Sequence, residues 1–123
     1  MNRLVSTLLI AALLVPGAAL AQSREDEGSA VLQSRLRALD ADPERAGLAA
    51  YERLRARQAI ETLAATRGSQ ARTDARQVAE WRVEIAEIAA ATELARRAID
   101  RLERERSELL VEASRQDAAR ARA

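Results

Sequence analysis

Acidic residues are the side chains here whose type and spacing come nearest to general acid–base chemistry. Glu80 and Glu84 lie four residues apart on one face of a helix, as two cooperating carboxylates could. The sequence has no His, Cys or Lys to act with them, and no glycine-rich phosphate loop. Nothing near the pair predicts a pocket, so we interpret both as solvated charges. We expect no catalytic residue and predict that the protein is not an enzyme.

Metal, cofactor and nucleic-acid sites are also not expected. A metal would need carboxylates alone, and Arg side chains that alternate with the acidic residues compete for them. The Arg residues form no basic block, and Trp81 and Tyr51 are the only rings available for stacking on bases. These two rings could mark a ligand or partner site, but a lone Trp on the inner seam of a hairpin favours a core anchor.

Residues 1–21 have the three-part pattern of a secretory signal peptide. Arg3 gives a positive start, residues 4–15 are almost entirely apolar, and Pro16-Gly17 breaks the helix. Ala19 and Ala21 place small residues before a cleavage site, so we expect cleavage after Ala21 and a periplasmic protein. The alternative is an uncleaved anchor, but the apolar core is too short to span a membrane comfortably. We expect no transmembrane segment after cleavage, and the lack of Cys is compatible with a bacterial periplasm.

Three helices are expected in the remaining chain. Residues 22–28 are polar and predict a flexible leader. Ser29 can cap a first helix that ends near Asp40. The Asp42-Pro43 pair predicts the start of a second helix, which runs to about Thr66. Arg67-Gly68 ends it, and Ser69 can cap a third helix that continues to about Arg122, without Gly or Pro.

The second and third helices carry distinct apolar faces. In the second, a stripe predicts the core, Gly47 is expected inside the helix at a close backbone contact, and Arg53, Arg57 and Glu61 are expected on the opposite side. The stripe consists of Leu48, Ala49, Ala56, Ala59, Ile60 and Leu63. The third helix has a heptad-like seam at Val78, Trp81, Ile85, Ile88, Thr92, Ala95, Ile99, Leu102, Arg106 and Leu109. Its second face has Ala79, Val83, Ala86, Ala90 and Leu94, and we expect two helices to pack on these two faces.

The fold class that follows is all-α. The short turn at 67–70 predicts an antiparallel hairpin, and the first helix lies back over it in a three-helix up-down-up arrangement. Residues 29–100 form this domain. Residues 101–123 form a projecting charged helix or connector, which the second helix is too short to cover. This stalk is either a solvated extension or a coiled-coil spacer to a partner, although Arg106 and Gln116 weaken a homomeric seam.

The chain from about Ala30 to Ala121 resembles a helical envelope family of proteobacteria, a domain of unknown function that often precedes an OmpA-like peptidoglycan-binding domain. The resemblance rests on Leu36, Ala38 and Leu39, on "YERLRARQA" at 51–59, and on "EIAEIAAATELARRAI" at 84–99. The segment 104–123 is similar to the connector into that domain. The resemblance implies an envelope role in which the protein reaches peptidoglycan only indirectly.

The chain departs from this family in two ways. Unlike many relatives, it has no Cys for acylation. Because it stops within the connector pattern, a truncated or split product and a stand-alone module are both open.

We therefore predict a non-catalytic periplasmic structural or adaptor protein, associated with outer-membrane or peptidoglycan-binding proteins. Its partners would be an envelope protein or a second copy of the chain, bound through helices. The alternative is a periplasmic binding module, similar to a chaperone or inhibitor, that uses the apolar groove of the hairpin.

Overall fold

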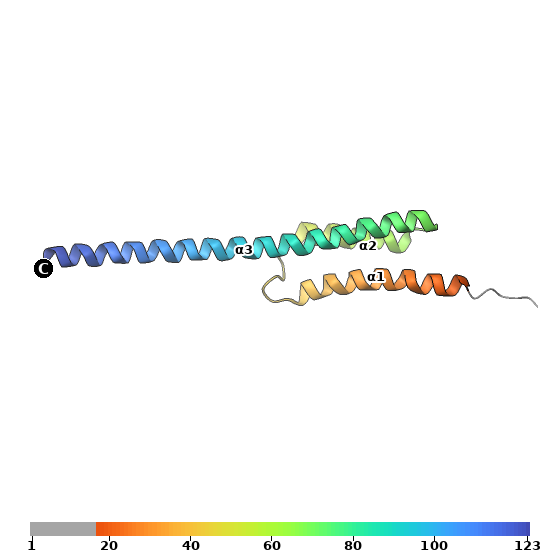
Figure 1. The fold of residues 1–123 in the computed structure, drawn as a ribbon, viewed down its shortest axis with the longest axis horizontal. Coiled ribbons are helices and arrows are strands. Elements are labelled where there is room, and N and C mark those ends of the chain that lie inside the picture. The colour runs from red at the N-terminus through yellow and green to blue at the C-terminus, as the bar shows by residue number, and fades with distance from the viewer. Residues whose placement is uncertain (1–16) are drawn as a thin grey trace, which may run out of the picture.

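The computed structural model describes the backbone from Gly17 to Ala123 and the side-chain surroundings from Glu27 onward. Three helices and no strand occur in this part: α1 (Gly17–Ala41), α2 (Ala50–Ala65) and α3 (Ser69–Arg122). In Figure 1, α1 and α3 run in the same direction and α2, partly hidden behind α3, runs in the opposite direction. The predicted all-α, up-down-up fold with a long third helix is confirmed. Most of the predicted signal peptide, residues 1–16, lies outside the described part.

Helix α1 is longer than the polar sequence before Ser29 predicts. It begins at Gly17 and includes residues 22–28, which we expected as a flexible leader. That segment contains no Pro, and its Arg and Glu side chains favour helix. Gly28 is buried inside the helix, and a Cβ built there would lie 3.3 Å from the guanidinium carbon of Arg76. The missing side chain therefore allows close approach between α1 and Arg76 of α3.

Helix α2 begins at Ala50, seven residues after Pro43, so the predicted start was wrong. The Asp42 carbonyl accepts hydrogen bonds from the amides of Arg45 (3.1 Å) and Ala46 (2.7 Å), which form a single helical turn. Gly47 then takes φ 81°, and Ala49 takes φ 52°. These left-handed residues end the turn before a helix can propagate. No atom lies within 4 Å of a Cβ built on Gly47, so the expected close backbone contact was also wrong.

The core is thin and consists mainly of leucine and alanine. Its residues are Leu32, Leu36 and Leu39 of α1, Leu48 and Ala49 of the loop, Ala56, Ile60 and Leu63 of α2, and Ala79, Val83, Ala86 and Ala90 of α3. The apolar stripe predicted for the second helix is therefore buried, with Ala59 partly buried at its edge. Four alanines are completely buried, so the helices lie close together.

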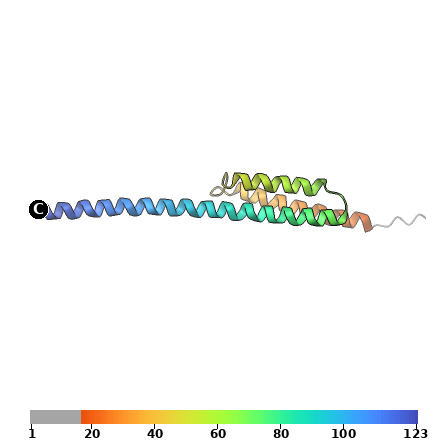
Figure 2. The same ribbon diagram turned by 90° about the horizontal axis from the view of Figure 1, so that it is seen from above.

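Helix α3 extends far beyond the other two helices. Figures 1 and 2 show α1 and α2 side by side along its first half, with the second half alone. Every residue from Ile99 to Ala123 is exposed. This solitary part is about 36 Å long at the usual helical rise. The predicted division of the third helix near residue 100 agrees with this change in exposure. None of the helices from Gly17 onward combines the length and apolarity needed to cross a membrane.

Candidate interaction surface

Helix α3 has two opposite apolar faces, and only one is covered. The covered face consists of Ala79, Val83, Ala86 and Ala90, all completely buried. The other face, which we call the seam, consists of Val78, Trp81, Ile85, Ile88, Ile99, Leu102 and Leu109, and these side chains are 45 to 70% exposed. Successive helical residues turn by about 100°, so Val83 and Ile85 point in nearly opposite directions. The expectation that two helices cover both faces was wrong, because the seam stays exposed.

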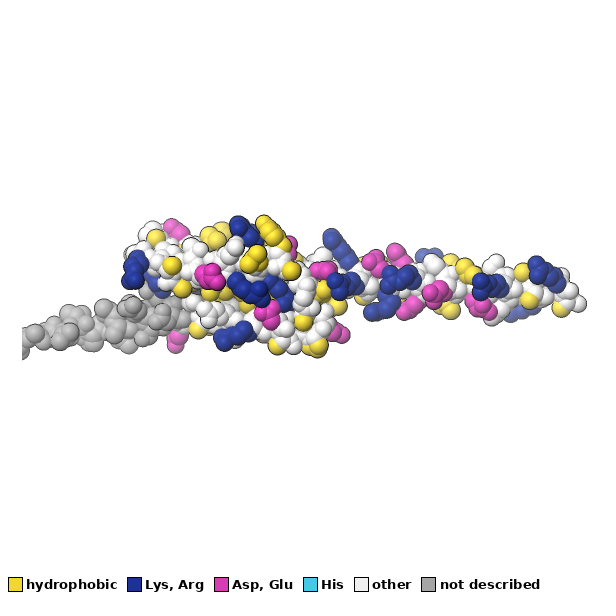
Figure 3. All heavy atoms as spheres, turned by 180° about the vertical axis from the view of Figure 1, so that it is seen from behind, with side chains coloured by type: hydrophobic (Ala, Val, Ile, Leu, Met, Phe, Trp, Pro, Cys, Tyr) yellow, Lys and Arg dark blue, Asp and Glu magenta, His cyan; other side chains and the backbone are white. Residues whose placement is uncertain are grey.

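The covered face explains why the seam stays open. Its alanines let α1 and α2 both pack near one side of α3, where the backbones approach more closely than they could beside Ile or Trp. Trp81 is 57% exposed, so its expected role as a core anchor was wrong. Figure 3 shows apolar side chains spaced among charges along the solitary half of α3. One signal in the sequence could have identified this surface: the seam keeps its spacing beyond the reach of the second helix.

Arg35 and Glu87 tie α1 to α3 beside the seam. The guanidinium donates two hydrogen bonds to the carboxylate, from Nε to Oε1 at 2.9 Å and from Nη2 to Oε2 at 2.5 Å. The bond with Glu87 raises the pKa of Arg35, and the negative charges of Glu84 and Glu80 add to this effect. The positive charge of Arg35 neutralises part of the acidic side of α3.

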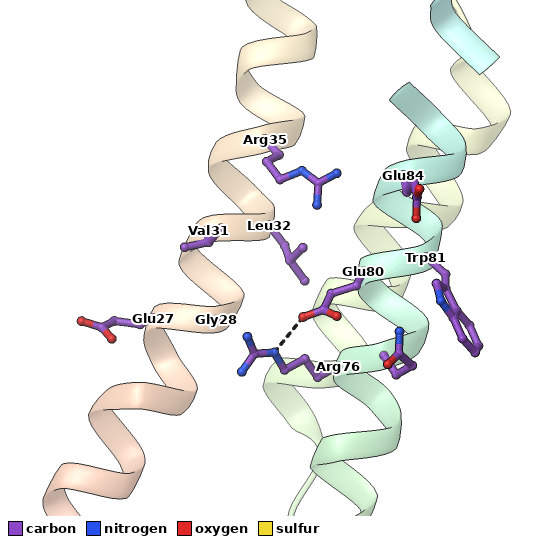
Figure 4. A pocket seen from close by; sticks show the side chains of 10 residues that line it. Glu27, Gly28, Val31, Leu32, Arg35, Arg76, Glu80, Trp81 and Glu84 are labelled. Atoms are coloured by element: carbon purple, nitrogen blue, oxygen red, sulfur yellow. Dashed lines mark hydrogen bonds and ion pairs between the residues drawn. The ribbon is translucent and has the colours of Figure 1, made fainter. Parts of the chain in front are cut away.

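A groove of about 570 Å³ lies between α1 and α3. It is lined by Glu27, Gly28, Val31, Leu32, Arg35, Arg76, Gln77, Glu80, Trp81 and Glu84. The Arg76 Nε donates to Glu80 Oε1 at 2.9 Å, and Figure 4 shows this pair between the helices while the Trp81 ring points away from α1. Glu80 and Glu84 thus lie together in this groove, although no pocket was predicted near them. The groove forms because α1 lies beside this part of α3, which the residues near the pair could not show. Both have Arg neighbours, which favours their interpretation as solvated ion pairs.

Arg53 is the charged side chain that the core encloses. It is 4% exposed, although its position in the sequence predicted a solvent-facing residue. Its guanidinium binds the carboxylate of Asp40 and donates to the carbonyls of Leu39 (3.3 Å) and Arg45 (2.6 Å). The Leu39 carbonyl cannot receive a hydrogen bond from residue 43, because Pro43 has no N–H, and Arg53 supplies a donor in its place. The Arg45 carbonyl also accepts from the Leu48 amide at 3.0 Å. Arg53 therefore joins the end of α1 to the loop before α2.

Glu93 caps α2 from the neighbouring helix. Its Oε2 accepts a hydrogen bond from the Ala49 amide at 3.0 Å, and its Oε1 accepts one from Arg97 at 2.8 Å. The backbone hydrogen bond is the main cause that lowers the pKa of Glu93, and Arg97 acts in the same direction. The side chain of Asp42 bonds instead to the amide of Glu44 in the preceding turn. The prediction that Asp42 caps α2 was therefore wrong, since Glu93 accepts the hydrogen bond at the start of this helix.

These contacts hold the helices together and offer little that resembles a reaction centre. In the region from Glu27 to Ala123, no group of three acidic side chains is arranged to hold a metal ion. The exposed seam of α3 is therefore the strongest candidate for a functional surface. No family model, curated protein or solved structure matches the chain.

Proposed function

We propose that this is a non-catalytic structural or adaptor protein of the bacterial cell envelope, located in the periplasm. One observation carries the structural part of the proposal: α3 leaves its own domain near residue 99 and continues as an exposed helix. A helix that projects from its own domain, with every residue from Ile99 onward exposed, is suited to reach a partner. The signal-like residues 1–21 support the compartment.

The partner class in this proposal is an outer-membrane or peptidoglycan-binding protein, as the family resemblance implies. Peptidoglycan would then be reached only through that partner. The absence of His, Cys and Lys from the sequence supports a role without catalysis.

Cell fractionation with mass spectrometry of the amino terminus tests the compartment. We expect the protein in the periplasmic fraction, with Gln22 as its first residue. Intact protein that retains Met1 and stays in the cytoplasm would contradict the proposal.

Crosslinking in cells tests the adaptor role. The full chain should capture an envelope protein, and deletion of residues 101–123 should abolish this capture while the domain stays folded. A partner retained after the deletion would instead favour the alternative, a chaperone-like or inhibitor-like module that uses the hairpin groove. In the structure, the hairpin of α2 and α3 is already covered, because Leu32, Leu36 and Leu39 of α1 pack in the core with residues of both helices. Such a module would need α1 to move away.

A further inference from the structure

The spacing of the seam specifies the kind of helix that can cover it. Its positions from Val78 to Leu109 alternate by three and four residues, which is the 3.5-residue period of a left-handed coiled coil. In heptad notation, position a holds Val78, Ile85, Thr92, Ile99 and Arg106, and position d holds Trp81, Ile88, Ala95, Leu102 and Leu109. A second helix of the same period, supercoiled gently around α3, is therefore the shape that fits this face.

The seam is also nearly symmetric about its centre. Small residues, Thr92 and Ala95, lie in the middle, and larger residues follow in both directions. We infer that the seam binds the seam of a second copy in the antiparallel direction, centred between Thr92 and Ala95. The resulting layers are Thr92 with Ala95, Ile88 with Ile99, Ile85 with Leu102, Trp81 with Arg106, and Val78 with Leu109, each residue paired with its counterpart on the second copy. All seven exposed seam residues then have a partner.

Arg106 selects this direction over a parallel one. In a parallel, in-register pair, Arg106 would face Arg106 of the second copy at a core position, and two like charges there are unfavourable. In the antiparallel pair, Arg106 lies against the exposed ring of Trp81 of the second copy. An Arg on the face of a Trp is a favourable cation–π contact. The residue that weakens a parallel seam therefore becomes part of the antiparallel one.

Charged residues on either side of the seam also favour this antiparallel register. In antiparallel coiled coils, residues at position e meet position e of the other helix, and here Arg82 meets Glu103 of the second copy, twice by symmetry. At position g, Glu84 meets Glu105, which is unfavourable. Arg35, which lines the same groove as Glu84, reduces this repulsion through its positive charge. If the antiparallel pair were shifted by one heptad, so that its centre lay at residue 97, Arg96 would face Arg96 of the second copy. This repulsion disfavours the shifted register.

The domains leave room for such a pair. α1 and α2 pack on the face with Ala79 and Val83, opposite the seam. In the dimer, the solitary half of each α3 covers the exposed seam of the other domain, and the two domains lie at opposite ends. This inference goes beyond the proposed envelope role, since it holds in any compartment.

Sedimentation equilibrium of the purified protein tests the association. We expect the mass of two chains, and the mass of one chain for Leu102→Glu. Val111→Asp is the matched control: Val111 is 50% exposed on the same helix but lies at position f, away from the seam. This variant should stay dimeric, and both variants should keep the cooperative unfolding of the domain. A wild-type monomer or trimer, or a control that dissociates equally, would overturn the inference.

A spin label at Val111→Cys tests the direction. The chain has no other Cys, so each copy carries one label. In the antiparallel register the two labelled positions are about 52 Å apart along the axis, whereas a parallel pair gives no axial separation. Electron–electron dipolar spectroscopy should therefore show a distance between the two labels of about 50 Å or more. A distance of about 25 Å or less, which the helix diameters alone would give, would overturn the antiparallel assignment.

Reversing one charge pair tests the register. Glu103→Arg should weaken the dimer roughly tenfold, because it places two Arg residues together at two symmetric sites. The double variant Arg82→Glu with Glu103→Arg should restore the wild-type dissociation constant. Failure of the double variant to recover, with the domain folded, would overturn this register.

Discussion

Arg53 has the largest predicted effect of any single polar residue. Replacement by Ala leaves the Leu39 carbonyl without its donor and removes the buried guanidinium from Asp40, whereas the Arg45 carbonyl keeps the Leu48 amide as a donor at 3.0 Å. A buried unsatisfied carbonyl costs about 1–3 kcal/mol, and the lost charged hydrogen bond adds to this. We therefore expect Arg53→Ala to lower the free energy of unfolding by about 2–4 kcal/mol, measured in urea. Arg57→Ala is the control, since Arg57 binds the same Asp40 from an exposed position and should cost less than about 1 kcal/mol. Equal losses from both variants would contradict the role of Arg53.

Glu93 makes the stability depend on pH. Its pKa is lowered in the folded state, so its contribution is present above the unfolded pKa and is lost as the pH falls through the folded pKa. The difference in unfolding free energy between wild type and Glu93→Gln should therefore be largest near neutral pH and should shrink in acid. Urea unfolding from about pH 7 to about pH 3 measures it. A difference that does not change with pH would mean that Glu93 does not act as a charged cap.

Two glycines have opposite roles in their elements. Gly47 has φ 81° in the loop before α2, so Gly47→Ala should destabilise the fold by about 1 kcal/mol or more. Gly28 lies inside α1, where Ala favours helix, and its nearest neighbour is the flexible end of Arg76. We expect Gly28→Ala to change the free energy of unfolding by less than about 0.5 kcal/mol. Thermal unfolding of both variants checks this, and a larger loss at Gly28 than at Gly47 would contradict it.

Sequence patterns predicted the helices better than their ends. The apolar stripe of α2 and the turn at Gly68 before α3 agree with the structure, because they follow from periodicity and from glycine. The predicted cap by Ser69 was wrong, since Gly68 is the N-cap, without a side-chain hydrogen bond, and Ser69 is the first helical residue. The start of α2 did not follow from Asp42-Pro43, since the left-handed Gly47 and Ala49 interrupt the helix that this pair begins. Local signals cannot show that Glu93, 44 residues away, supplies the cap.

The same limit explains the errors on the interaction surface. Periodicity identified both apolar faces of α3, yet it could not show which face the domain covers. That choice depends on how closely α1 and α2 approach, and the buried alanines decide it through tertiary packing. Arg53 was misplaced for a similar reason, because its partners belong to the end of α1 and the loop.

The whole molecule divides into a packed domain and a helix that leaves it. Residues 101–123 are fully exposed, so their deletion should change the unfolding free energy of the monomeric domain by less than about 0.5 kcal/mol. Urea unfolding at protein concentrations below the association range measures this. A loss of several kcal/mol would show that the projecting helix packs on its own domain.

Hydrogen exchange across protein concentration measures directly whether a second copy stabilises the solitary half of α3. A helix without tertiary contacts has little stability of its own. Amides of residues 101–118 should exchange rapidly in dilute wild-type protein and in Leu102→Glu, and slowly in concentrated wild type. Amides near Val83 should stay protected in every sample. Protection of residues 101–118 that is equal at all concentrations, and unchanged in Leu102→Glu, would show that no second copy stabilises this helix.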